Sequence, residues 1–77
     1  MKAKIKFKNI DDIIWFTNRT SVLHGDINIW DGHTGFDGKS VCALLNLDLS
    51  KVFGLELISD DKDDIEVFNQ LVERYQA

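Results

Sequence analysis

The sequence predicts an α+β domain in which a four-stranded antiparallel sheet carries three helices on one face, in the order βαββαβα. Residues 2–8 alternate lysine with Ala, Ile and Phe, a period of two that is typical of a strand with one solvated face. Residues 65–75 repeat apolar side chains every three or four positions, which is typical of an amphipathic helix. Such helices must bury their apolar stripe against a sheet face. The 77 residues suffice for one such layer pair, so we expect a single domain, 1–77.

The first half of the chain predicts a strand followed directly by a helix. Asn9 is an N-cap residue type, and Asp12, three positions later, completes a sequence similar to a capping box. Apolar side chains then recur at helical spacing, so we expect a helix from about Ile10 to about Ser21. Gly25 ends this region.

The middle of the chain predicts a β-hairpin. Residues 26–30 alternate again, and Asp31-Gly32 is a dipeptide that favours a tight turn. A second short strand, residues 33–36, returns from that turn. Asp37-Gly38 forms the next turn and leads into a helix that begins at Ser40 and ends between residues 47 and 49.

The last part predicts one strand and one helix. Residues 52–58 are apolar enough for a central strand. We expect this strand to lie between the first and second strands, because the first helix crosses over and leaves room there. Ser59 and Asp60 start the last helix, and its apolar stripe is formed by Ile65, Phe68, Leu71, Val72 and Tyr75.

Composition excludes several classes of protein. The single Cys42 cannot form an internal disulfide, which suits a reducing cytoplasm. Lysines at every second position of residues 2–8 interrupt any leader-like or membrane-spanning run. The net charge of −4 repels a phosphate backbone. We therefore expect a cytoplasmic protein that uses no cofactor and binds neither nucleic acid nor membranes.

Residues 39–49, Lys-Ser-Val-Cys-Ala-Leu-Leu-Asn-Leu-Asp-Leu, carry a resemblance to a known family. They resemble the segment of the bacterial histidine-containing phosphocarrier (HPr) family in which Lys-Ser precedes an apolar pair, a small residue and a Leu-rich run. The resemblance implies that Ser40 is a regulatory phosphorylation site. It also implies a docking patch beside it, formed by Lys39, Val41, Cys42, Leu44 and Leu45. The predicted element order is that of the HPr-like open-faced sandwich.

The phosphocarrier reaction needs a nucleophilic imidazole at a helix N-terminus and a nearby arginine. In the HPr family, a loop reading His, a small residue, Arg, Pro supplies both between the first strand and first helix. Here Lys8-Asn9-Ile10-Asp11-Asp12-Ile13 occupies that place, without histidine, and the chain contains no proline. Two carboxylates there repel a phosphoryl group. We therefore expect no catalytic residue and no enzyme activity.

The two histidines do not replace this loop. His24 follows the C-terminal end of the first helix, where no free N–H groups face an anion. His33 falls in the hairpin turn and is predicted to be a solvated surface residue. A metal site formed by His24, His33 and Asp26 or Asp31 lacks the close ligand spacing of known metal motifs, so none is expected.

Two other groups of residues have ordinary structural interpretations. The acidic run at residues 60–64 lacks the spacing, the turn glycine and the distal Glu of a calcium loop, so a solvated helix start is predicted. Trp15 and Phe16 are adjacent on a helix and cannot both point inward. One of the two is expected to be at least partly exposed.

These observations predict a non-catalytic regulatory or protein-binding module of the sugar phosphotransferase type that acts through the Ser40 helix. Its partners would be phosphotransferase components or a regulator. Two alternatives remain open: an active phosphocarrier that uses His24 or His33, and a structural domain that self-associates through exposed aromatic side chains.

Overall fold

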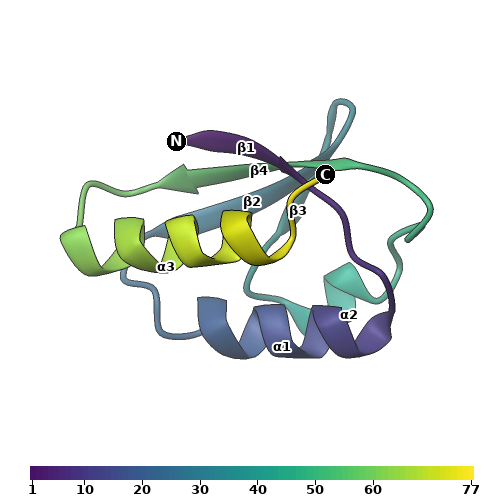
Figure 1. Cartoon of the computed structure of the whole chain (residues 1–77), viewed down its shortest axis with the longest axis horizontal. Helices are drawn as coiled ribbons and strands as arrows, with labels where there is room; N and C mark the ends of the chain where they lie inside the picture. The colour runs from purple at the N-terminus through teal and green to yellow at the C-terminus, as the bar shows by residue number, and fades with distance from the viewer.

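The computed structural model describes residues 1–77 and contains four strands and three helices (Figure 1). In chain order they are β1 (Lys2–Ile5), α1 (Ile10–Thr20), β2 (Asp26–Asp31), β3 (Thr34–Asp37), α2 (Val41–Leu44), β4 (Phe53–Ile58) and α3 (Lys62–Arg74). The predicted α+β class and the order βαββαβα are confirmed.

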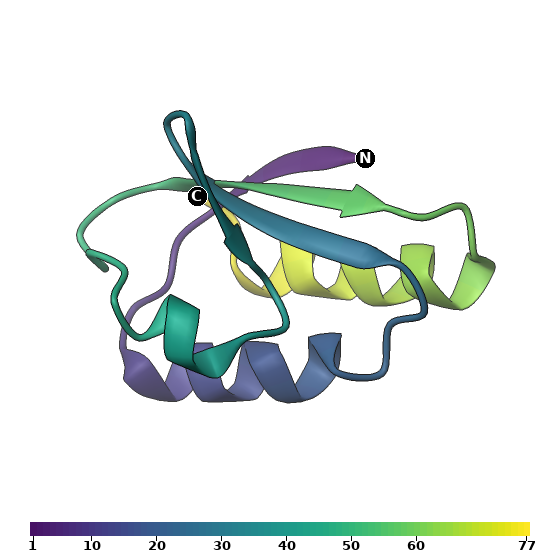
Figure 2. The same ribbon diagram turned by 180° about the vertical axis from the view of Figure 1, so that it is seen from behind.

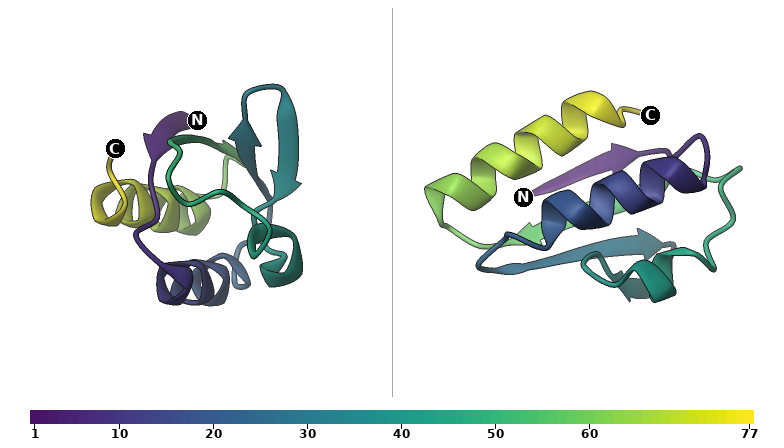
Figure 3. Two further views of the ribbon diagram at one scale, coloured as in Figure 1. Left: turned by 90° about the vertical axis from the view of Figure 1, so that its right-hand side faces the viewer. Right: turned by 90° about the horizontal axis from the view of Figure 1, so that it is seen from below.

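The strands form one antiparallel sheet in the order β1-β4-β2-β3. Strand β4 therefore lies between β1 and β2, as the crossover argument predicted. The three helices lie along one face of this sheet and leave the other face open (Figures 2 and 3). The longest helix, α3, has 13 residues, and no helix has the length and apolar character needed to cross a membrane.

The core lies between the sheet and the helices and contains fifteen buried apolar residues. Phe7 is fully buried and packs edge-on against both Phe16 and Tyr75, with ring centroids 5.3 Å apart in each pair. Trp15 is only half-buried, and the Arg74 guanidinium lies 3.9 Å from its ring centroid. This arrangement confirms that one of the pair Trp15 and Phe16 remains partly exposed.

Three element boundaries differ from the predictions by more than one residue. Strand β1 ends at Ile5, because the Lys6 N–H turns to donate to the Tyr75 carbonyl. Helix α2 has only four residues, and the chain beyond it continues in turns closed by bonds such as Leu47 N–H to Leu44 O. Helix α3 is capped by Asp61, whose carboxylate accepts from the N–H groups of Asp63 and Asp64, so it begins later than predicted.

Candidate functional site

The turn before Ser40 is attached to the rest of the molecule by three hydrogen bonds. The Thr20 hydroxyl, which is fully buried on α1, donates to the Gly38 carbonyl at 2.8 Å. The Gly38 N–H donates to the Ile27 carbonyl at 2.8 Å, and Lys39 Nζ donates to the Leu23 carbonyl at 2.9 Å. The position of Ser40 is thus set by α1 and β2 rather than by the short helix that follows it.

Ser40 is the N-cap of α2. Its Oγ accepts a hydrogen bond from the Ala43 N–H at 3.2 Å, and the residue is half-buried. No other hydrogen bond engages this hydroxyl. Ser40 thus begins the helix as predicted, and its hydroxyl oxygen accepts this one hydrogen bond only.

The residues after Ser40 divide between the surface and the core. Val41 and Leu45 are 37% and 46% exposed, and Cys42 is also exposed. Leu44 is fully buried. Its assignment to the docking patch is therefore wrong, because a side chain enclosed in the core cannot contact a partner. We define the Ser40 surface as Ser40, Val41, Cys42 and Leu45.

Lys39, the residue before Ser40, makes two hydrogen bonds within the chain. Its ammonium group is directed at the Leu23 carbonyl, while its N–H donates to Asp37 Oδ1 at 2.9 Å. A phosphate on Ser40 would therefore lie near the Asp37 carboxylate, and Lys39 would have to leave its carbonyl partner to offset that charge.

The N-terminus of α1 is closed by the chain's own side chains. Asn9 Oδ1 accepts from the Asp12 N–H at 3.0 Å, and Asp12 Oδ2 accepts from the Lys8 N–H at 2.8 Å. A cavity of about 210 Å³ beside them is bordered by Lys6, Lys8 and Arg74 among others. No histidine lines this cavity. The start of α1 therefore has a carboxylate at the place where the phosphocarrier reaction would need an imidazole.

A cluster of His24, Asp61 and Asp64 was missed by the sequence analysis. His24 Nδ1 lies 3.0 Å from Asp61 Oδ2 and 3.9 Å from Asp64 Oδ1. Asp64 is only 2% exposed, so the prediction of a solvated helix start is wrong for this residue. Its carboxylate accepts from the N–H groups of His24 and Gly25 and from the Ser59 hydroxyl. Asp64 thereby joins the chain after α1 to the start of α3.

These contacts shift three pKa values. The hydrogen bond and charge of Asp61, with help from Asp64, raise the pKa of His24. The bond from the Asp64 N–H and then the His24 contact lower the pKa of Asp61. Burial acts to raise the pKa of Asp64, but the bonds from His24, Ser59 and Gly25 outweigh it, and the pKa falls. The cluster therefore favours an imidazolium beside two carboxylates.

The same cluster is the only set of side chains that could hold a metal ion. Its ligand atoms lie within 4.8 Å of one another. The set differs from the one considered from the sequence, since His33 lies in the turn between β2 and β3. Because both oxygens of each carboxylate already take part in contacts within the chain, a metal ion would have to displace them.

No protein-family model matches the chain, and no curated protein matches its sequence.

Proposed function

We propose that the chain is an HPr-like module of the bacterial sugar phosphotransferase type that binds a protein partner through the Ser40 surface. It works in the cytoplasm, transfers no phosphoryl group itself, and is regulated by phosphorylation of Ser40. Its partner is a phosphotransferase component or a regulator.

The observation that carries this proposal is the division of side chains around Ser40. Leu44 anchors the short helix in the core, while Val41, Cys42 and Leu45 remain at the surface next to a half-buried hydroxyl that bonds only to the Ala43 N–H. Apolar groups left exposed beside a modifiable serine are suited to a contact that a phosphate can strengthen or block.

The start of α1 supports a non-catalytic role. Asp12 is committed to the Lys8 N–H, so a carboxylate occupies the place where the phosphocarrier reaction requires an imidazole. A phosphoryl donor approaching there would meet negative charge. The element order βαββαβα agrees with that of the HPr-like family, which the resemblance of residues 39–49 also implies.

Intact-mass analysis after two separate reactions tests the proposal. One reaction supplies phosphoenolpyruvate and the first enzyme of the phosphotransferase system, and the other supplies ATP and the HPr serine kinase. We expect one added phosphate only in the second reaction, with loss of that phosphate in Ser40→Ala. Ser50→Ala is the matched control, because Ser50 is an exposed serine whose hydroxyl bonds only to Asp48.

The other outcomes support the alternatives. A phosphate on His24 or His33 in the first reaction would make the chain an active phosphocarrier. No phosphate in either reaction would contradict regulation through Ser40. Self-association at high protein concentration would then favour the structural role.

A further inference from the structure

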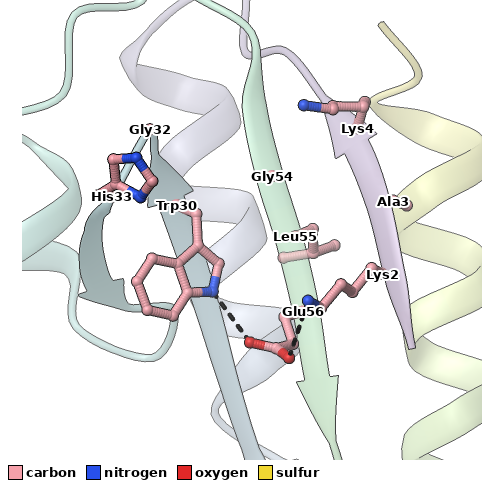
Figure 4. Close-up of a pocket in the computed structure, with 9 residues that line it drawn as sticks. All are labelled: Lys2, Ala3, Lys4, Trp30, Gly32, His33, Gly54, Leu55 and Glu56. Atoms are coloured by element: carbon pink, nitrogen blue, oxygen red, sulfur yellow. Dashed lines mark hydrogen bonds and ion pairs between the residues drawn. The ribbon is translucent and has the colours of Figure 1, made fainter.

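The open face of the sheet contains a groove that the Ser40 surface does not use. The groove is a cavity of about 410 Å³ over β1, β4 and the hairpin of β2 and β3 (Figure 4). Its lining includes Lys2, Lys4, Trp30, His33, Gly54 and Glu56. No helix covers this face (Figure 3).

The strand register produces the groove. Lys4 pairs with Gly54, Gly54 pairs with Trp30, and Trp30 pairs with Gly35, so these four residues form one row across the sheet. Adjacent strands are about 4.8 Å apart, which places the Lys4 and Trp30 backbones about 10 Å apart with only a glycine between them. No side chain therefore stands between Trp30 and Lys4 in this row.

Trp30 is held as a fixed wall of the groove. Its Nε1–H donates to Glu56 Oε1 at 3.0 Å. The six-membered part of its ring covers Gly35, where an added Cβ would lie 2.9 Å from Trp30 Cζ3. Because these contacts orient the indole beforehand, little side-chain entropy is lost when a ligand packs against it.

Charge is distributed unevenly along the groove. At one end, Glu56 accepts from Trp30, and its other carboxylate oxygen lies 3.9 Å from Lys2 Nζ. At the other end lie His33, in the hairpin, and Lys4, whose side chain extends from β1 toward β4 (Figure 4), and Lys4 makes no ion pair. This end therefore has a free cation and attracts an anionic group.

We propose that this groove binds a small ligand in which a planar heterocycle carries an anionic group, the chemistry of a nucleotide. The ring packs against Trp30 over Gly54, and the anion pairs with Lys4 at the hairpin end. Aromatic packing supplies contact with any heterocycle, and the ammonium selects for the anion.

The two tryptophans provide a direct assay by nuclear magnetic resonance. The indole N–H signal of Trp30 reports the groove, whereas that of Trp15, which lies on α1 beneath Arg74, serves as the internal reference. We expect adenosine 5′-monophosphate at millimolar concentration to shift the Trp30 signal and leave the Trp15 signal in place. Adenosine and ribose 5-phosphate, which each lack one half of the recognised chemistry, should bind more weakly.

Three variants test the residues involved. Lys4→Gln should weaken binding of the monophosphate by roughly two- to fivefold. Gly54→Ala places a methyl group on the floor of the groove and should weaken binding by roughly tenfold or more. Lys62→Gln makes the same charge change on α3, below the sheet, and should leave binding unchanged.

The results that would overturn the proposal are equally definite. An unmoved Trp30 signal would show that the groove does not bind this chemistry. If ribose 5-phosphate bound as tightly as adenosine 5′-monophosphate, the heterocycle would contribute nothing to binding. If adenosine bound as tightly as the monophosphate, the anionic group would contribute nothing. An equal loss of affinity in Lys62→Gln and Lys4→Gln would show an effect of net charge alone.

Discussion

Replacing Thr20 by valine should destabilise the protein through the turn that positions Ser40. Valine keeps the size and β-branching of threonine but removes the hydroxyl that donates to the Gly38 carbonyl at 2.8 Å. Gly38 is buried, and no other donor bonds to its carbonyl oxygen. A buried acceptor left without a partner costs about 1–3 kcal/mol. We therefore expect the free energy of unfolding to fall by that amount.

Thr17→Val is the matched control on the same helix. Thr17 is 7% exposed, and its hydroxyl donates only to the carbonyls of Ile13 and Ile14, within its own helix. Backbone N–H groups one turn ahead also bond to helix carbonyls, so the substitution leaves no orphaned acceptor. We expect a change within about 0.5 kcal/mol.

Urea denaturation followed by circular dichroism measures the free energy of unfolding of both variants. We expect the dependence of this free energy on urea concentration to be the same as in the wild type. Thermal unfolding gives a second measurement, since 1 kcal/mol corresponds to about 4–8 °C in Tm for a domain of this size. Amide hydrogen exchange should also quicken at Ala43, whose N–H bonds to Ser40 Oγ. The reasoning is refuted if Thr20→Val lowers the free energy of unfolding no more than Thr17→Val does. The hydrogen bond from Thr20 to the Gly38 carbonyl would then contribute nothing to stability.

Two further predictions concern α2 and the histidine cluster. Leu44→Ala should cost about 2–5 kcal/mol and Leu45→Ala about 0.5 kcal/mol or less, measured by urea denaturation, and equal costs would contradict the observed rotation of the helix. The raised pKa of His24 means that its contribution to stability is complete below pH 6.5 and is lost as pH rises through the raised value. The lowered pKa values of Asp61 and Asp64 mean that their contributions are present above pH 3.8 and are lost as pH falls through the lowered values. The free energy of unfolding of the wild type should therefore decline between pH 5 and pH 9, whereas that of His24→Gln should not. Parallel curves of this free energy against pH would contradict the ion pair.

The fold class was predictable because its signals are local. The alternation of residues 2–8, the cap at Asn9 and the Asp31-Gly32 dipeptide each depend on neighbours only a few positions away. The order of strands also followed from the sequence, since few crossover connections are compatible with this element order. The Ser40 cap was predictable for the same reason.

Other features depend on residues that are distant in the sequence. Asp64 is in an acidic run that predicts solvation, yet it is buried because His24 and Gly25, about 40 positions earlier, turn their N–H groups toward it. No local pattern encodes that contact. The burial of Leu44 beside exposed Leu45 was equally hidden, because a helix of four residues is too short for its apolar spacing to fix its rotation.

The sequence by itself determined the elements, their order and the absence of histidine from the start of the first helix, because periodicity, caps and turns act between near neighbours. Only the tertiary structure decided which side chains face outward around Ser40, and that Lys4, Gly54 and Trp30 lie in one row of the open sheet face. The physical reason is that register joins strands through hydrogen bonds that the sequence of one strand alone does not specify. The Ser40 surface depends on other long-range contacts, such as the hydrogen bond from the Thr20 hydroxyl to the Gly38 carbonyl.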